Sequence, residues 1–169
     1  MLRIDFANMI IGGGAIAYGC VQEEIMFCAC PELIVSRLLC NVMQSDEAIV
    51  ILGTEQFSTP DGYGFSLKCG GAYEDTTPFD HEGVRKSSIS AIDALDFRRG
   101  GAQTQFSPEK VLRELTKAFA GFDVPEAPEN IASGNWGCGA FRGGYRIKIS
   151  YPVGCSFSSK KATELFSMG

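Results

Sequence analysis

The stretch LRIDFANMIIGGGAIAYGCVQEEI, residues 2–25, joins a strand pattern to a glycine triplet and two adjacent glutamates. Apolar and polar side chains alternate over LRIDF, which predicts a short strand. The residues from Asn8 to Gly14 then predict a loop at the carboxyl end of that strand. After the loop we expect one or two helical turns over AIAYGCVQEEIMF, with the glutamates near their middle. Ligands in open α/β sheets bind beyond the carboxyl ends of strands, so this loop is the first candidate for a binding site.

Further strands are predicted along the rest of the chain. Apolar runs bounded by turn residues indicate strands at residues 48–57, 65–75, 88–97 and 146–151. We expect the first of these to be buried on both faces, with turn chemistry in the TPDGYG that follows it. Strands interleaved with helices indicate an α/β fold in layers, built on a mixed sheet.

Two later helices are predicted from apolar periodicity. In residues 31–43, PELIVSRLLCNVM, Pro31 suits the first turn, and the expected apolar face consists of Leu33, Ile34, Leu38 and Val42. Residues 107–122, SPEKVLRELTKAFAGF, begin with a serine–proline start signal, and we expect Gly121 to stop the helix. The expected apolar face of this second helix consists of Val111, Leu112, Leu115 and Phe119.

Composition narrows the class of protein. The 169 residues fit one domain, and the net charge of −5 argues against direct binding of nucleic acid. Seven cysteines without a CxxC pair, together with a single histidine, argue against a zinc site and indicate free thiols in a reducing, intracellular compartment. The apolar run MIIGGGAIAY is interrupted by glycines and is far shorter than the roughly 20 apolar residues that span a bilayer. We therefore expect neither a leader peptide nor a membrane segment.

The candidate motifs each allow a second interpretation. Glycines let a ligand approach the backbone, but a triplet also makes a tight turn. Paired carboxylates suit acid–base chemistry on sugars, whereas adjacent glutamates are common on solvated helix faces. Because neighbouring helical residues point about 100° apart, Glu23 and Glu24 would divide the work, one as acid/base and one as a hydroxyl binder. Asp5 would ordinarily cap a strand end.

Three further features carry the same ambiguity. The segment NWGCGAF, residues 135–141, is either a turn with Trp136 as a packing anchor or a loop whose amides bind a pyrophosphate. The charged FRR at residues 97–99 indicates a solvated strand end. Asp93 is expected to pair with the backbone of a neighbouring strand.

The motifs taken in order resemble one known family. A glycine triplet followed, after seven residues, by Gln22-Glu23-Glu24 resembles the signature of the poly(ADP-ribose) glycohydrolases. The segments DFAN, PELIVSRLL, AIVILGTEQFS, DGY, AIDALDFRR, SPEKVLRELTKAFAGF and GNWGCGAF also resemble family segments in family order. The resemblance covers roughly residues 2–141 and rests on several independent segments.

The resemblance implies a macrodomain-like α/β/α fold with a mixed sheet. It also implies hydrolysis of the ribose–ribose O-glycosidic bonds of poly(ADP-ribose), with release of ADP-ribose and without a metal or cofactor. In such an enzyme Glu24 would be the acid/base that protonates the leaving ribose oxygen and then activates water. Glu23 would hold the adjoining ribose hydroxyls, and Asp5 would support the catalytic loop.

The resemblance also implies a set of substrate-binding residues. Asn8 and Phe141 would lie on the ribose side, while Gln22 and Tyr63 would lie toward the adenosine. Two glycine loops would cradle the diphosphate. They consist of Gly12, Gly13 and Gly14, and of Asn135, Trp136, Gly137, Cys138, Gly139, Ala140 and Phe141.

The sequence departs from the family pattern near both ends. We therefore expect residues 1–141 to be part of a catalytic macrodomain and residues 142–169 to be a divergent tail, so that the macrodomain is incomplete. An incomplete fold predicts marginal stability and little activity. The alternative function is a non-catalytic ADP-ribose-binding macrodomain. Either protein would be a monomer of the nucleus or cytoplasm whose partners are poly(ADP-ribose) and ADP-ribose, in the response to DNA damage.

Overall fold

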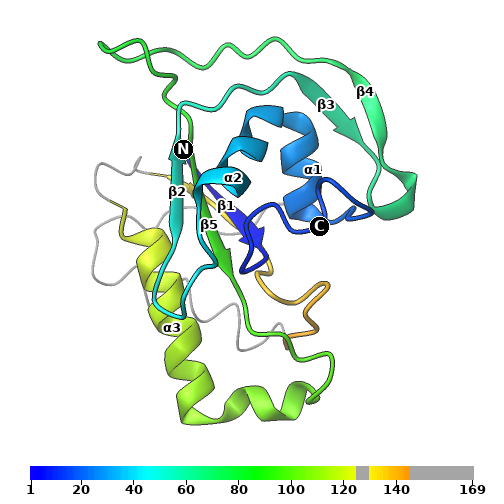
Figure 1. The fold of residues 1–169 in the computed structure, drawn as a ribbon, viewed down its shortest axis with the longest axis vertical. Coiled ribbons are helices and arrows are strands. Elements are labelled where there is room, and N and C mark those ends of the chain that lie inside the picture. Colours follow the sequence, from blue (N-terminus) through cyan, green and yellow to red (C-terminus); the bar gives the residue numbers. More distant parts are fainter. Residues whose placement is uncertain (125–129, 145–169) are drawn as a thin grey trace.

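The computed structural model describes residues 1–124 and 130–144 of the chain. A four-stranded mixed sheet forms its centre, in the order β2, β5, β1, β6 (Figure 1). β1 (Leu2–Ala7) is parallel to both of its neighbours, β5 (Ser88–Asp93) and β6 (Ile131–Ala132). β2 (Ile49–Leu52) is antiparallel to β5. The strand at residues 146–151 and the tail expected from residue 142 lie almost wholly outside the described residues.

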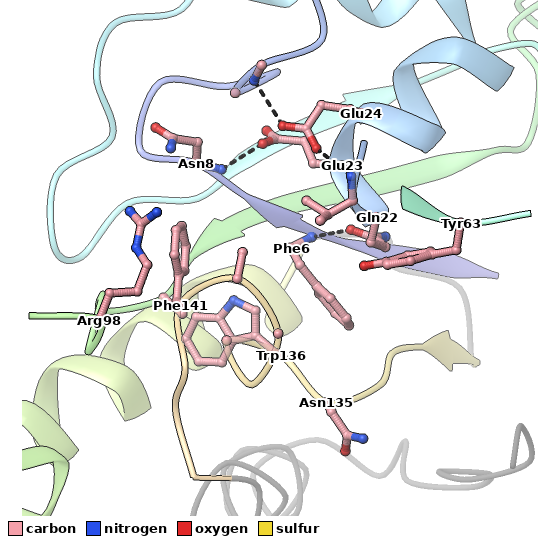
Figure 2. A pocket seen from close by; sticks show the side chains of 17 residues that line it. Phe6, Asn8, Gln22, Glu23, Glu24, Tyr63, Arg98, Asn135, Trp136 and Phe141 are labelled. Atoms are coloured by element: carbon pink, nitrogen blue, oxygen red, sulfur yellow. Dashed lines mark hydrogen bonds between the residues drawn. The ribbon is translucent and has the colours of Figure 1, made fainter. Parts of the chain in front are cut away.

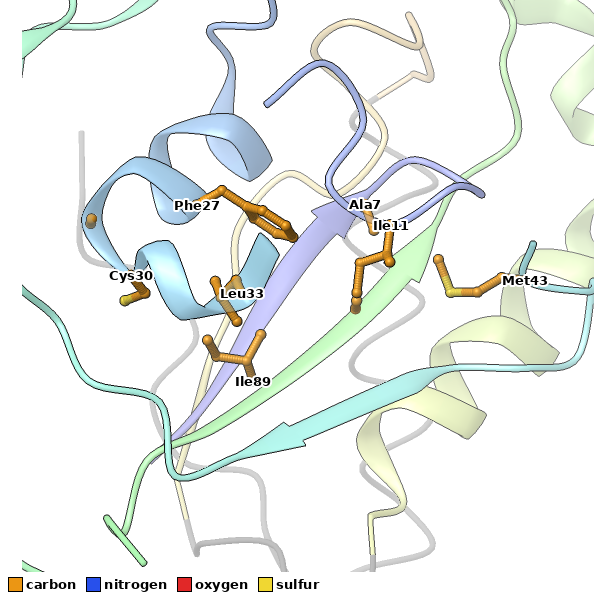
Figure 3. Close-up of a cluster of buried hydrophobic side chains, with 9 residues drawn as sticks. Ala7, Ile11, Phe27, Cys30, Leu33, Met43 and Ile89 are labelled. Atoms are coloured by element: carbon orange, nitrogen blue, oxygen red, sulfur yellow. The ribbon is translucent and has the colours of Figure 1, made fainter. Parts of the chain in front are cut away.

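Helices cover both faces of this sheet and bury two apolar clusters. On one face, Phe27 of α1 (Gln22–Ala29) and Leu33 of the 3₁₀ helix η1 (Pro31–Val35) pack toward Ala7, Ile89 and Ala91 (Figure 3). On the other face, Ala118 of α3 (Pro108–Phe122) packs with Leu2, Ile4, Ile92 and Trp136. The expected α/β/α layering is confirmed.

A separate antiparallel hairpin lies beside α1 (Figure 1). It consists of β3 (Ser58–Asp61) and β4 (Lys68–Ala72), with the 3₁₀ helix η2 (Gly64–Ser66) in the connection. The strand expected over residues 48–57 is therefore too long, because β2 ends at Leu52 and the chain continues into β3. β2 is an edge strand with Val50 and Leu52 exposed, so it is not buried on both faces.

The helix expected over residues 31–43 is wrong in its second half. η1 leads into a single helical turn, α2 (Ser36–Leu39), and Cys40 already has extended backbone angles. The extended chain allows Met43 to enter the core and to donate its amide proton to the carbonyl of Met9, at 2.9 Å. Leu38, expected on the apolar face, is 83% exposed.

The helix expected over residues 107–122 is present, but only half of its expected apolar face is correct, because Val111 and Leu115 pack against the core whereas the other two residues do not. Leu112 and Phe119 are exposed, whereas Glu114 and Lys117 are buried. The reason is that polar groups lie opposite this face: Asp93, the Leu95 amide, and the carbonyls of residues 44 and 47. Gly121 does not stop the helix. A Cβ there would lie 2.4 Å from Cγ2 of Ile92, so glycine allows α3 to approach the sheet.

Candidate active site

The two glutamates lie in the first turn of α1, because the helix begins only at Gln22. The prediction that they lie near the middle of a helix is therefore wrong. The residue before the helix, Val21, has no polar side chain to satisfy the first amides. Oε2 of Glu24, the third residue of the helix, instead accepts the amide proton of Val21 itself at 3.0 Å. Negative charge is also favoured at this end of a helix by the helix dipole.

Backbone amides of the glycine loop hold both carboxylates in place (Figure 2). The amides of Asn8 and Gly12 donate to Oε2 and Oε1 of Glu23, at 2.9 and 2.6 Å. The amide of Gly14 donates to Oε1 of Glu24 at 2.9 Å. Glu23 and Glu24 leave the helix in different directions, but these hydrogen bonds hold both carboxylates against the same loop.

The middle glycine of the triplet is required by the carboxylates themselves. Gly13 has a φ of 43°, and a Cβ on it would lie 2.6 Å from Oε2 of Glu23 and 2.7 Å from Oε1 of Glu24. The Gly13 amide donates to the Ile10 carbonyl at 3.0 Å, so all three triplet amides have acceptors inside the protein. In this structure the triplet positions the glutamates, and the expected role in holding a diphosphate stays a prediction.

Arg37 of α2 holds the same loop from its carbonyl side. Its Nη1 donates to the carbonyl of Gly13 at 2.7 Å and to that of Ile11 at 3.2 Å. Arg37 was not predicted from the sequence, because an arginine in a helical pattern carries no signal of a distant backbone partner.

Asp5 lies in β1 and is almost fully buried. Neither carboxylate oxygen has a hydrogen-bond partner within the described part of the chain. Burial raises the pKa of Asp5 well above its usual value, and the charges of Glu23 and Glu24 raise it further. Asp5 is thus not a capping carboxylate, and a proton on it is favoured.

Glu23 also has a strongly shifted pKa. Burial, assisted by the charge of Glu24, raises its pKa to about 7, against the opposing effect of the Asn8 and Gly12 amides and of Arg37. A carboxyl group that exchanges a proton near neutral pH is typical of acid–base sites.

A pocket of about 220 Å³ opens over these carboxylates (Figure 2). It contains most of the predicted site residues: Asn8, Gly13, Gly14, Gln22, Glu23, Glu24, Tyr63, Asn135, Trp136, Gly137, Gly139, Ala140 and Phe141. Three predicted residues do not line it. Asp5 is buried in β1, a Cβ on Gly12 would meet Phe27, and the Cys138 thiol is half-buried beside the Trp136 carbonyl.

The loop at residues 135–141 forms the wall opposite the glutamates. Trp136 is buried, and its indole nitrogen donates to the carbonyl of Ile92 at 2.9 Å, so it is a packing anchor as well as a lining residue. The amides of Gly137, Gly139 and Ala140 have no acceptor among residues 1–124 and 130–144. Because all three residues line the pocket, their amides are candidate donors to a ligand.

Gln22 and Tyr63 lie together at one end of the pocket (Figure 2). The Gln22 side chain accepts from the Phe6 amide at 2.8 Å and donates to the Ile4 carbonyl at 3.1 Å, so it ties α1 to β1. Tyr63 is mostly exposed and is free to contact a ligand.

Four further residues that were not predicted from the sequence line the pocket. They are Phe6, Val21, Ala94 and Arg98. Arg98 belongs to the FRR that was interpreted as a solvated strand end: Arg98 and Arg99 are exposed as expected, whereas Phe97 is buried, so the prediction is wrong for Phe97. Asp93 was also interpreted wrongly, since it pairs with Arg113 and Lys117 of α3, at 2.6 and 2.8 Å.

The described residues add two general observations. None of their helices has the length and apolar character needed to cross a membrane. Their six cysteines are all free thiols, and they hold no group of three or more His, Cys, Asp or Glu side chains arranged to bind a metal.

Comparison with known proteins places the chain in a family. The pattern of the family described as poly(ADP-ribose) glycohydrolase, macro domain fold, matches residues 1–162. The match therefore continues past the boundary expected at residue 141.

Individual relatives support the same grouping. Poly(ADP-ribose) glycohydrolase 1 of Caenorhabditis elegans is 40% identical over 164 residues, which is 89% of this chain and 21% of the relative. Poly(ADP-ribose) glycohydrolase 2 of the same organism is 38% identical over 94% of this chain and 35% of the relative. Poly(ADP-ribose) glycohydrolase 1 of Arabidopsis thaliana is 43% identical over 72% of this chain and 22% of the relative.

The chain spans only about a fifth to a third of the length of these relatives. The layered α/β fold of the described residues agrees with the macro domain fold of the matching family. The chain belongs to the poly(ADP-ribose) glycohydrolase family and has its macro domain fold.

Proposed function

We propose that this protein is a glycosidase that hydrolyses the ribose–ribose O-glycosidic bonds of poly(ADP-ribose) and releases ADP-ribose. The observation that carries the proposal is the pair of carboxylates beside Gly13, held by loop amides at the floor of an open pocket. A protein that only binds ADP-ribose has no need of two adjacent carboxylates there. The relatives named poly(ADP-ribose) glycohydrolases support the same reaction.

In the proposed reaction Glu24 protonates the leaving ribose oxygen and then removes a proton from the attacking water. Its two oxygens each accept one amide proton, from Gly14 and Val21, which fixes the carboxylate while leaving lone pairs free. Glu23, which exchanges a proton near pH 7, binds the neighbouring ribose hydroxyls as donor or acceptor. Burial and the charges of Glu23 and Glu24 raise the pKa of Asp5, which favours a proton there and so limits the negative charge near the pair.

The rest of the pocket binds the substrate in this proposal. The amides of Gly137, Gly139 and Ala140, which have no acceptor among the described residues, donate to the diphosphate, as backbone amides in glycine-rich loops commonly do. Tyr63 and Gln22 lie toward the adenosine, and Asn8 and Phe141 contact the distal ribose. The substrate is therefore expected to lie across the pocket with its reacting ribose over Glu24.

Release of ADP-ribose from poly(ADP-ribose), measured beside calorimetric binding of ADP-ribose, tests the function. Glu24→Gln should lower the rate by about a thousandfold, since an amide cannot transfer the proton. Its affinity for ADP-ribose should stay within a few-fold of that of the unmodified protein. Glu109→Gln is the matched control, because Glu109 is an exposed glutamate in the first turn of α3.

Two outcomes would contradict the proposal in different ways. Substantial hydrolysis by Glu24→Gln would remove Glu24 from the acid/base role. Binding of ADP-ribose by the unmodified protein without any hydrolysis would instead identify a non-catalytic ADP-ribose-binding macrodomain.

The cellular setting and assembly are part of the same proposal. The protein acts as a monomer inside the cell, in the nucleus or cytoplasm, on polymer made in response to DNA damage. The free thiols support a reducing compartment, and the net charge of −5 argues against direct contact with nucleic acid. Light scattering on the purified protein tests the monomer, and imaging of the tagged protein tests the location.

A further inference from the structure

Arg98 lies at the end of the pocket that is opposite Tyr63 and Gln22. Figure 2 shows its side chain beside Phe141 and on the same side as Asn8. If the adenosine lies toward Tyr63, this end is where a polymer leaves the pocket. Arg98 would then face the next unit of the substrate.

Arg98 places a positive charge in a pocket whose other charged lining residues are acidic. Among the described residues that line the pocket it is the only cation, while Glu23 and Glu24 carry carboxylates. Poly(ADP-ribose) has two phosphate charges in every unit, so these carboxylates repel it. A single cation at one end of such a pocket favours an anionic group at that end.

The guanidinium of Arg98 is held in position before any ligand binds. Its Nε and Nη2 donate to the Asp96 carboxylate at 2.9 and 2.5 Å, and its own amide donates to Oδ1 of Asp96 at 2.9 Å. Its Cζ lies 5.8 Å from the ring centroid of Phe141, and the Phe97 amide donates to the Phe141 carbonyl at 2.9 Å. Nη1 makes no hydrogen bond or ion pair within the described residues and can donate to a ligand.

The exposure of Arg98 indicates which part of a substrate it can contact. Just over half of its side chain is exposed, at 55%, whereas Glu23 and Glu24 are buried. A group that contacts Arg98 therefore lies at the mouth of the pocket and not above the carboxylates. A single bound ADP-ribose would end at the distal ribose beside Phe141.

We propose that Arg98 is a specificity-determining residue that binds a phosphate of the ADP-ribose unit adjoining the one in the pocket. The inference rests on the proposed function and deepens it. Arg98 would thereby make the site prefer a polymer, or its oligomers, over free ADP-ribose. Asp96 would serve as a positioning residue for the guanidinium.

Binding measurements with two ligands test this inference. In a Glu24→Gln background, which leaves the polymer intact, calorimetry would compare ADP-ribose with a purified oligomer of two to four ADP-ribose units. Arg98→Gln should weaken oligomer binding about tenfold, as expected for one charge-assisted hydrogen bond, and should change ADP-ribose binding less than about twofold. Arg99→Gln is the matched control, because it removes the same charge from an exposed neighbour that does not line the pocket.

Asp96→Asn provides a second variant that keeps Arg98. It should weaken oligomer binding by a smaller factor, since the guanidinium remains but is held less firmly. Arg98→Lys should restore part of the oligomer affinity, because the charge returns without the fork geometry.

Three results would overturn the inference. Equal behaviour of Arg98→Gln and Arg99→Gln would show only a general effect of charge. Equal weakening of both ligands by Arg98→Gln would indicate that Arg98 supports the loop of Phe141 and does not contact a neighbouring unit. Failure of the Glu24→Gln parent, with Arg98 intact, to bind either ligand would reject the proposed function itself.

Discussion

Buried carboxylates occur beside both α1 and α3, but only those beside α3 are paired with cations. Asp93 forms ion pairs with Arg113 and Lys117, and Arg113 also pairs with Glu114 at 2.8 Å. Beside α1, Asp5, Glu23 and Glu24 form no ion pair with any described residue. Glu23 and Glu24 are held by backbone amides, and Asp5 has no hydrogen-bond partner among those residues.

The paired carboxylates beside α3 stabilise the fold, whereas the unpaired carboxylates beside α1 are suited to proton transfer. A buried carboxylate with a fixed cation keeps its charge and ties elements together, as Asp93 ties β5 to α3. Buried carboxylates without cations hold their protons more tightly, and the raised pKa values of Asp5 and Glu23 reflect this. We therefore expect substitutions among the paired groups beside α3 to affect folding. We expect substitutions that disturb Asp5, Glu23 or Glu24 beside α1 to affect catalysis.

The largest expected effect is on stability, from Lys117→Met. Nζ of Lys117 contacts Asp93 at 2.8 Å and donates to the carbonyls of Gln44 and Glu47, and the side chain is fully buried. Removing one partner of a buried ion pair should lower the free energy of unfolding by about 3–5 kcal/mol, measured by denaturant titration.

Lys110→Met on the same helix is the control for Lys117→Met. Lys110 is only partly buried, so its replacement should cost less than about 1 kcal/mol. If Lys117→Met and Lys110→Met lowered the free energy of unfolding equally, the buried ion pair of Lys117 would contribute no more to stability than a surface lysine.

The second prediction concerns Gly13→Ala, which should displace the unpaired carboxylates of Glu23 and Glu24. The new Cβ would overlap oxygens of both Glu23 and Glu24 and would displace the carboxylates. Activity should fall by at least about a hundredfold, because small displacements of reacting groups are costly. The left-handed φ should cost about 1–3 kcal/mol of stability.

Gly100→Ala is the matched control for Gly13→Ala, since its nearest contact would be Oγ1 of Thr104 at 3.5 Å. Release of ADP-ribose and the unfolding free energy should be measured for both variants. Unchanged activity in Gly13→Ala would show that the glutamates need no fixed position.

The third prediction sharpens the comparison through pH. The pKa of Glu23 is raised to about 7 in the folded protein, from a usual value of 4.5. Between these values the folded protein holds a proton that the unfolded chain releases, so stability falls as pH rises from 4.5 to 7. The slope from one such group is at most about 1.4 kcal/mol per pH unit.

Glu23→Gln should flatten this slope, whereas Glu109→Gln should keep it. Unfolding free energies measured across this pH range provide the test. A slope that is the same in Glu23→Gln and in the unmodified protein would show that Glu23 does not carry the proton.

The sequence predicted the elements whose patterns are local. β1, β5 and α3 were found because alternation, apolar runs and the Ser107–Pro108 start signal need no knowledge of distant residues. The predictions failed where a distant partner decides. Lys117 is buried on α3 because carbonyls of residues 44 and 47 accept its protons, and the helical propensity of residues 40–43 yields to the burial of Met43.

The same division holds for the site. The glycine triplet, the glutamates and the loop at residues 135–141 were predicted through a resemblance, and the structure brings most of them to one pocket. Arg37 and Arg98 were missed because their roles depend on the Gly13 carbonyl and on Phe141, which lie far away in the sequence. No local pattern reports such partners.

The pairing of β1 has a consequence for the order in which the site is assembled. Leu2 pairs with Ser88 in β5 and with Ile131 in β6, so the central strand finds its neighbours only when distant parts of the chain have been synthesised. Glu23 and Glu24 precede β5 and β6 in the chain, so the sheet beneath their loop forms only after the glutamates have been synthesised. Contacts of such long range slow folding. Pulse-labelling hydrogen exchange during refolding should therefore find the Phe6 and Asn8 amides protected only in the last phase, after those within α3.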